Sequence, residues 1–265
     1  MRTIDLPVGK RDRRRATAAG TRATSRGVGR RKGSGAPLRA KPVITIDGPA
    51  GAGKSTAAGE LARRLGYRLI DTGALYRGIA WRVREAKVDP RAEPALRRLL
   101  AETTIDLRDG TVLVDGRDVT GEIRTPEIGE FTSRISTLAA VRAKVTPIQR
   151  RLAAAGGAVL EGRDTGSVVC PDAEVKFYLD ASPGVRALRR QAELEAPAIP
   201  ISPREVRAEI GRRDRQDRQR ALAPLVVPDG AVVIDSTERS VEEVIQVMLD
   251  KVMQEVARHG CCTRS

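Results

Sequence analysis

A glycine-rich stretch near residue 50 has the residue types and the spacing of a phosphate-binding loop. Residues 48–55 read GPAGAGKS and fit the pattern G-x-x-x-x-G-K-[ST]. Glycines allow backbone N–H groups to turn inward and approach a phosphate closely. Lys54 supplies a compact positive charge, and the Ser55 hydroxyl can ligate Mg²⁺. We therefore expect the following residues to hold the phosphates of a nucleotide: Gly48, Pro49, Ala50, Gly51, Ala52, Gly53, Lys54, Ser55 and Thr56.

The neighbouring sequence predicts the strand and the helix that must position this loop. Residues 43–46 form a short β-branched run that is typical of a buried parallel strand. After the loop, apolar residues recur on one helical face over 57–65, and Gly66 is suited to end that helix. The helix would direct its N-terminal dipole at the anion. This order favours a phosphate-binding loop over a glycine-rich connector without a ligand.

Four further apolar runs predict that the loop belongs to an α/β domain with a parallel sheet. The runs cover 67–70, 158–160, 175–179 and 231–234, and helical patterns separate them. Five strands that alternate with helices imply a sheet covered by helices on both faces. Ligands in such sheets bind at the carboxyl ends of the strands. Four residues fall at these ends: Gly48, Asp71, Glu161 and Asp235.

The helices and one small insertion complete the expected fold. Asp109-Gly110 and Asp115-Gly116 separate short strand-like runs, which indicates an antiparallel meander inserted into the domain. Helices are expected over about 72–87, from near 90 to 100, over 126–138 and 139–155, from Ser202-Pro203 to 220, and from 241 to at least 256. Capping boxes mark the last two, with Ser202 and Glu205 in one and Ser240 and Glu243 in the other.

The 265-residue chain has a formal net charge of +14, and most of the basic excess lies near the N-terminus. Residues 1–41 contain 13 of the 48 Lys/Arg and 2 of the 34 Asp/Glu, with few large apolar residues. Such a segment cannot bury a core. We expect a disordered extension or an overlong translation start. The alternatives are a nucleic-acid-binding arm and an organelle transit peptide.

The cysteine and histidine content argues against a disulfide framework, a zinc site and a histidine general base. The three cysteines (Cys170, Cys261 and Cys262) indicate a reducing cytoplasm, and Cys170 is expected in the core. The one histidine is His259. No apolar run approaches the roughly 20 residues needed to span a bilayer. The N-terminus also lacks the apolar core of a signal peptide.

An excess of arginine beside the strand ends points to a second anion site. Arg77 and Arg163 follow two of the predicted strands, and residues 211–220 contain no large apolar side chain. Arg213, Asp217 and Arg220 are spaced i, i+4, i+7 and would share one helix face. One interpretation is a solvated face with ion pairs. The other is an anion-binding segment that closes over phosphates as a lid.

Taken in order, these stretches resemble the bacterial cytidylate kinase family over about residues 43–255. The resemblance rests on ITIDGPAGAGKST, LIDTGALYR, GEIRT, EGRDTG, PDAEVKFYLDAS, RRDRQDRQRALAPL and IDST. It implies phosphoryl transfer from MgATP to CMP or dCMP and a sheet of strand order 2-3-1-4-5. It also implies a domain over 42–258 with an acceptor-binding insertion at about 104–155 and a lid at about 191–221, between the extension 1–41 and a tail over 259–265.

The resemblance also implies roles for individual residues of the acceptor site. Thr72 and Arg77 match contacts to the acceptor phosphate and ribose. The residues that match the positions reading cytosine are Ser133, Arg142 and Asp164. Asp217 matches a sugar-binding aspartate. Arg163, Arg213 and Arg220 match arginines that contact the acceptor nucleotide and the transferring phosphate. Together with Lys54, they are the expected catalytic residues.

On the donor side, the resemblance places Arg189 near the adenine and assigns Mg²⁺ to Ser55 and Glu161. Relatives often carry aspartate at the position of Glu161 and sometimes glycine at that of Ser55. Three alternatives stay open: another small-molecule P-loop kinase, a nucleotide-binding regulator without turnover, and a nucleic-acid-binding protein that depends on the extension. We expect a cytoplasmic monomer without a membrane partner.

A first prediction concerns the basic extension. A chain that begins at Lys41 should fold and keep the kcat and KM of the full chain, because the loop and its strand begin at Val43 and the extension has no core-forming face. Steady-state kinetics of both chains test this. Loss of activity or of soluble expression on truncation would show that the extension takes part in the fold.

Overall fold

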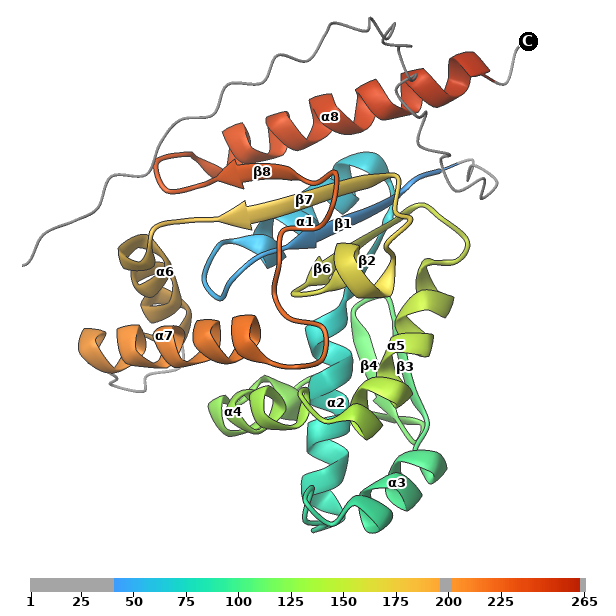
Figure 1. The fold of residues 1–265 in the computed structure, drawn as a ribbon, viewed down its shortest axis with the longest axis vertical. Coiled ribbons are helices and arrows are strands. Elements are labelled where there is room, and N and C mark those ends of the chain that lie inside the picture. The colour runs from blue at the N-terminus through green and yellow to red at the C-terminus, as the bar shows by residue number, and fades with distance from the viewer. Residues whose placement is uncertain (1–40, 196–201, 263–265) are drawn as a thin grey trace, which may run out of the picture. The chain divides into compact units, whose positions relative to one another are not determined.

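A five-stranded parallel sheet forms the centre of the computed structural model, which describes residues 41–195 and 202–262 (Figure 1). Its strands are β1 (Val43–Asp47), β2 (Arg68–Asp71), β6 (Ala158–Gly162), β7 (Val175–Asp180) and β8 (Val232–Asp235). They are arranged in the order β2-β6-β1-β7-β8. Counted along the chain, this is the order 2-3-1-4-5, so the expected α/β fold and strand order are confirmed.

Helices cover both faces of this sheet because its buried strands carry apolar residues on both sides. On one face, Ile44, Ile46 and Phe177 pack in one core with α1 (Lys54–Leu65) and α8 (Val241–Cys262). On the other face, Val43 and Leu160 pack with α2 (Thr72–Glu85) and α5 (Ala139–Ala153). α1 begins directly after the phosphate-binding loop and ends at Gly66, which has a left-handed backbone, as the sequence predicts.

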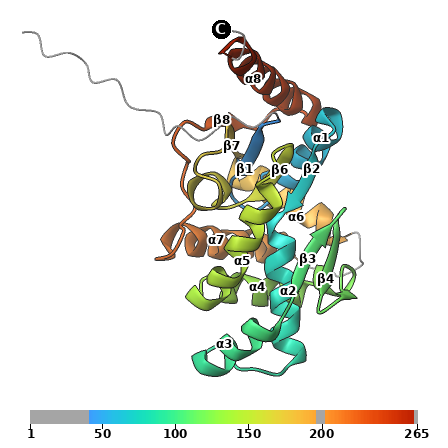
Figure 2. The same cartoon turned by 90° about the vertical axis from the view of Figure 1, so that its right-hand side faces the viewer.

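The inserted region packs on α2 (Figure 2). Its meander consists of β3 (Ile105–Arg108), β4 (Thr111–Val114) and β5 (Arg117–Asp118), and the Asp-Gly pairs at both turns have positive φ. Gly78 lets the meander approach α2, since a Cβ atom there would lie 2.7 Å from Ile105 Cδ1. The short helix η1 (Glu122–Arg124), α3 (Glu93–Glu102) and α4 (Pro126–Ile135) complete this region.

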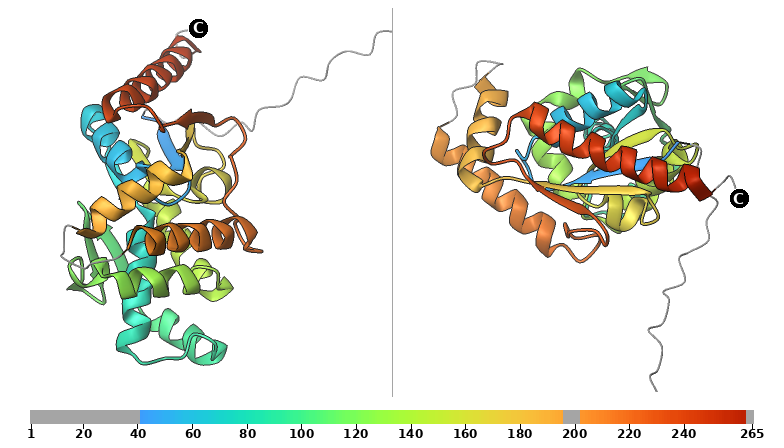
Figure 3. Two further views of the ribbon diagram at one scale, coloured as in Figure 1. Left: turned by 90° about the vertical axis from the view of Figure 1, so that its left-hand side faces the viewer. Right: turned by 90° about the horizontal axis from the view of Figure 1, so that it is seen from above.

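Two helices, α6 (Pro183–Glu195) and α7 (Pro203–Gln219), pack on each other at the carboxyl ends of the strands (Figure 3). Their shared apolar core is small and contains Ala187, Val206 and Ile210. The predicted capping box of Ser202 and Glu205 begins α7. Its last turn reaches α4, where the Gln216 side chain donates a hydrogen bond to the Ser133 carbonyl.

The structure differs from the expected elements at several places. β2 begins one residue late because the Tyr67 N–H closes α1 by bonding to the Ala62 carbonyl. α3 begins at Glu93 because a turn formed on Asp89 occupies the preceding residues. A turn of π-helix, η2 (Thr165–Val169), was not predicted at all. Arg220 lies just beyond α7 in extended backbone, although it was expected inside the helix.

Within 41–195 and 202–262, no helix combines the length and the apolar character that crossing a bilayer requires. The interpretations of residues 1–40 as a disordered or nucleic-acid-binding extension lie outside the described residues. The domain boundaries at 42 and 258 stay predictions, and α8 continues past the second of them to Cys262.

Candidate active site

The predicted phosphate-binding loop joins β1 to α1 and is held against neighbouring backbone. Gly48 has a φ of +153°, and a Cβ atom there would lie 2.0 Å from the Leu179 carbonyl oxygen. Gly51 has a φ of +72° and faces the backbone of Arg186 at 2.5 Å in the same way. A side chain at either position would force the loop away from the sheet and from α6, so glycine is required for its shape.

Lys54 is buried inside this loop, where its Nζ donates a hydrogen bond to the Pro49 carbonyl at 2.7 Å. Burial and then the nearby positive charge of Arg163 lower the pKa of its ammonium group to about 7, against the opposing negative charges of Glu161 and Asp217. Such a low pKa means that the surrounding residues stabilise the charged form of this lysine less well than water does. An anion in the loop would supply the missing negative charge.

The strand end of β6 places a carboxylate beside the loop. Glu161 is buried, pairs in register with Asp71 of β2, and accepts a hydrogen bond from the Ser55 hydroxyl at 2.8 Å. Burial and then the negative charge of Asp71 raise the pKa of Glu161. A hydroxyl and a carboxylate in contact are ligands that Mg²⁺ accepts, so Ser55 and Glu161 fit the expected metal position. No cluster of three metal-ligating side chains occurs among the described residues.

Arginines from four elements converge in front of this strand end. Arg77 of α2, Arg163 after β6, and Arg213 of α7 were predicted, whereas Arg190 of α6 was not. Burial lowers the pKa of Arg77, with repulsion from Arg190 and Arg163 adding to it, and burial and Arg163 lower that of Arg213. The sequence offers one signal for Arg190, because it directly follows Arg189 in the segment after a predicted strand. Mutually repelling guanidinium groups form a site for an anion with several charges.

A second group of predicted residues surrounds the Asp164 carboxylate. Arg142 donates a hydrogen bond to one of its oxygens, and Arg220 donates to the other at 3.2 Å. Asp164 and Arg142 are both buried, although Arg142 comes from the surface-like sequence of α5. Ser133 lies on α4 three residues before Ser136, whose carbonyl accepts from Arg142 at 3.5 Å. The Ser133 carbonyl itself accepts from Gln216. These four predicted residues are thus brought together beside the arginine cluster.

The polar face of α7 is buried rather than solvated. Asp217 accepts a hydrogen bond from Arg163 Nε at 3.0 Å and lies 3.7 Å from Arg220. The Arg220 side chain is only 5% exposed. The interpretation of 211–220 as an exposed run of ion pairs therefore fails for this face. The inward-facing charges pair with residues of the candidate site instead.

The side chains of the two remaining predicted residues, Thr72 and Arg189, form hydrogen bonds within the protein. Thr72 is buried, and its hydroxyl donates to the Glu161 carbonyl at 2.6 Å. Arg189 lies against the end of the phosphate-binding loop, because its guanidinium donates to the Ser236 carbonyl at 2.7 Å and to the Ala52 carbonyl at 3.5 Å. Thr72 therefore lies at the end of β6, and Arg189 lies beside the phosphate-binding loop.

A buried carboxylate that sequence reasoning missed joins the two halves of the site. Asp47 ends β1 directly before the loop and is fully buried. Its oxygens accept from the Thr165 N–H and hydroxyl, both at 2.8 Å, and from the Gly166 N–H at 2.7 Å. These bonds fix the segment that carries Asp164. A lone aspartate before a loop carries no signal for a partner 118 residues away.

Comparison with known proteins finds similar sequences over most of the chain. The sequence model described as cytidylate kinase matches residues 44–254. A cytidylate kinase of Pelotomaculum thermopropionicum is 44% identical over 216 residues, which cover 80% of this chain and 96% of that protein. A cytidylate kinase of a Geobacter species is also 44% identical, over 82% of this chain and 94% of that protein. Among solved structures, a shikimate kinase from Acinetobacter baumannii matches 82% of this chain and 95% of its own, with 16% identity and a TM-score of 0.40.

A second prediction tests the bonds made by Asp47. Asp47→Asn replaces one accepting oxygen by an amino group that faces a buried donor, so the free energy of unfolding should fall by roughly 1–3 kcal/mol. Asp235→Asn is the matched control, because Asp235 also ends a strand but is exposed and accepts only at Oδ1. Its effect should stay within about 0.5 kcal/mol. Urea denaturation measures both, and equal losses would contradict the role of Asp47.

Proposed function

This chain belongs to the cytidylate kinase family, and we propose that it transfers the γ-phosphoryl group of MgATP to CMP or dCMP. The observation that carries the proposal is the contact of Asp164 with Arg142, a carboxylate and a guanidinium held together beside the arginine cluster. A carboxylate can accept from the N4 amino group of cytosine, and a guanidinium can donate to its N3 or O2. Both named relatives are cytidylate kinases.

The donor half of the mechanism depends on the phosphate-binding loop. Its backbone N–H groups and Lys54 would hold the β- and γ-phosphates, and Arg189 would lie near the adenine. Ser55 and Glu161 would hold the Mg²⁺ ion, which neutralises charge on the phosphate oxygens when bound. The low pKa of Lys54 means that its cationic form is stabilised most when the negative phosphates are present.

The acceptor half would place CMP between α4, α5 and the loop after β6. Thr72 and Arg77 would contact its phosphate and ribose side, Asp217 its sugar, and Ser133, Arg142 and Asp164 its base. An oxygen of the acceptor phosphate then attacks the γ-phosphorus in line, its new bond forms as the bond to the β-phosphate oxygen breaks, and ADP leaves. Arg163, Arg213 and Arg220 would neutralise the charge on the transferring group.

α7 supports the proposal that a lid closes over both nucleotides. It contributes Arg213 and the neighbouring Arg220, and its contacts to Arg163 and Asp164 are polar. Closure would exclude water, which would otherwise accept the phosphoryl group. The expected monomeric state and cytoplasmic location stay predictions.

A third prediction uses the protonation of Lys54. With a pKa of about 7 in the free protein, this amine is mostly neutral at pH 8, and bound phosphates should raise its pKa and draw in a proton. MgATP binding at pH 8 should therefore take up close to one proton, and Lys54→Met should lose that uptake. Calorimetry in buffers of different ionisation enthalpy measures it. Equal uptake by both proteins would contradict the low pKa.

A fourth prediction tests the base-reading residues and with them the proposed function. Uracil presents a carbonyl at C4 and an N–H at N3. The Asp164 carboxylate would therefore face a second acceptor, and the Arg142 guanidinium would face a second donor. Each mismatch leaves a buried polar group unpaired, and kcat/KM for CMP should exceed that for UMP by roughly 10²-fold or more. Asp164→Ala should lose most of the CMP activity and narrow the ratio, whereas the exposed Asp229→Ala should change neither.

Steady-state kinetics with both nucleotides separate the possible outcomes. Equal use of UMP and CMP by the unaltered protein would contradict the base-reading assignment, even if nucleotide kinase activity remained. Absence of transfer to any nucleoside monophosphate, with MgATP binding intact, would favour another acceptor or a regulator without turnover. Thermal denaturation of Asp164→Ala shows whether a lost rate reflects a lost fold.

A further inference from the structure

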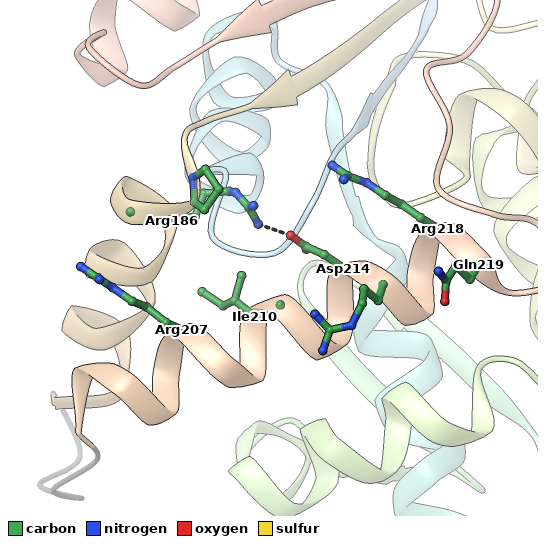
Figure 4. Close-up of a pocket in the computed structure, with 10 residues that line it drawn as sticks. Arg186, Arg207, Ile210, Asp214, Arg218 and Gln219 are labelled. Carbon is green, nitrogen blue, oxygen red and sulfur yellow. Dashed lines mark hydrogen bonds and ion pairs between the residues drawn. The ribbon is translucent and has the colours of Figure 1, made fainter.

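A cavity of about 590 Å³ lies between α6 and α7 and is lined by several arginines (Figure 4). The first turn of α6 forms one wall with Pro183 and Arg186, and α7 forms the other from Arg207 to Gln219. Its volume falls within the range of about 300–1,000 Å³ that is typical of small-molecule sites. None of the residues predicted to bind a nucleotide lines it.

The cavity and the candidate active site lie on opposite sides of α7. Successive residues of a helix are rotated by about 100°, so Arg207, Gly211 and Arg218 share one side. Arg213 and Gln216 point to the other side, toward the arginine cluster and α4. A molecule in the cavity would therefore bind outside the cleft that holds the two substrates.

The charges that line the cavity are strongly unbalanced. Four arginines contribute to it, and Asp214 is its one lining carboxylate, already engaged by Arg186 at 2.6 Å. Arg207, Arg215 and Arg218 are exposed and form no ion pair with any described residue. By contrast, Arg213 and Arg220 on the other side of the helix both have acidic partners. The cavity thus holds three guanidinium groups whose charge is not neutralised within the described structure.

We propose that this cavity binds a nucleoside di- or triphosphate as a second, regulatory nucleotide site. Guanidinium groups bind phosphate oxygens through paired, charge-assisted hydrogen bonds, and three of them suit a chain of phosphates. Pro183 and Ile210 add an apolar wall for the organic part. Asp214 Oδ1 is buried and has no hydrogen-bond partner among the described residues. A hydroxyl or amino group of the ligand's organic part would donate to it, and a fully ionised polyphosphate has no such donor.

Arg186 connects this site to the active site. Its Nη1 donates both to Asp214 and to the Ala50 carbonyl of the phosphate-binding loop, at 2.6 and 3.2 Å. Its Nε donates to the Ala181 carbonyl at 2.9 Å. A ligand that binds Asp214 and the neighbouring arginines therefore acts on the ion pair that ties α7 to the loop. Occupancy of the cavity shifts the position of the lid helix and changes the KM for the donor nucleotide.

The test is calorimetric binding of CTP to the full chain with both substrate sites blocked. A bisubstrate inhibitor, adenosine and cytidine joined by five phosphates, fills the cleft. The variant Arg215→Glu/Arg218→Glu reverses two charges of the cavity. Arg204→Glu/Arg212→Glu is the matched control, since both residues are exposed on α7 and do not line the cavity. Tight binding of the inhibitor by every variant shows that it is folded, and failure of the unaltered chain to bind it would count against the proposed function alone.

We expect one CTP to bind the blocked unaltered chain and the control. In the cavity variant, its affinity should fall by about 100-fold or more, because each charge-assisted hydrogen bond is worth roughly tenfold or more. Inorganic tripolyphosphate should bind more weakly than CTP and show the same dependence on Arg215 and Arg218. Equal CTP binding by the cavity variant and the control would overturn the site. Equal affinity for CTP and tripolyphosphate would overturn its assignment to a nucleotide.

Discussion

The three hydrogen bonds accepted by Asp47 are the interaction on which the candidate site depends. They join the strand that enters the phosphate-binding loop to the segment that carries Arg163 and Asp164. They add to the β1–β6 ladder and to the Ser55–Glu161 hydrogen bond, which also link the loop to the end of β6. A fully buried carboxylate is costly to desolvate, and burial indeed raises its pKa. Three donors offset that cost and fix the distance between the two halves.

A second constraint is the concentration of positive charge that the fold holds without a ligand. Lys54, Arg77 and Arg213 all have lowered pKa values because they are buried near other cations. Such repulsion destabilises the free protein and is relieved when phosphates enter. Relief of this repulsion therefore contributes to the free energy of nucleotide binding. The contribution is largest where the transferring group carries the most charge.

How far the sequence predicts this site depends on the range of the interactions involved. The loop, the Asp-Gly turns and the capping boxes follow from neighbouring residues, and the structure has them where the local patterns place them. The clustering of Arg142 with Asp164 required the family resemblance, because Arg142 alone looks like an ordinary surface residue of a helix. The π-helical turn η2 and the bonds of Asp47 were missed, since both depend on contacts between β1 and a loop more than 100 residues later.

The composition of α7 supports the proposal that its position responds to ligands. Only Val206 and Ile210 anchor it in an apolar core, and its other contacts described here are ion pairs and hydrogen bonds. Apolar burial would hold the helix in one place whatever is bound, whereas polar contacts can be exchanged for contacts with phosphates at little net cost. Asp217 makes such a contact with Arg163 of the candidate site, and Asp214, three residues earlier on the helix, makes one with Arg186 beside the cavity. The same physical property that would let α7 act as the proposed lid would therefore make it sensitive to an anion in the proposed second site.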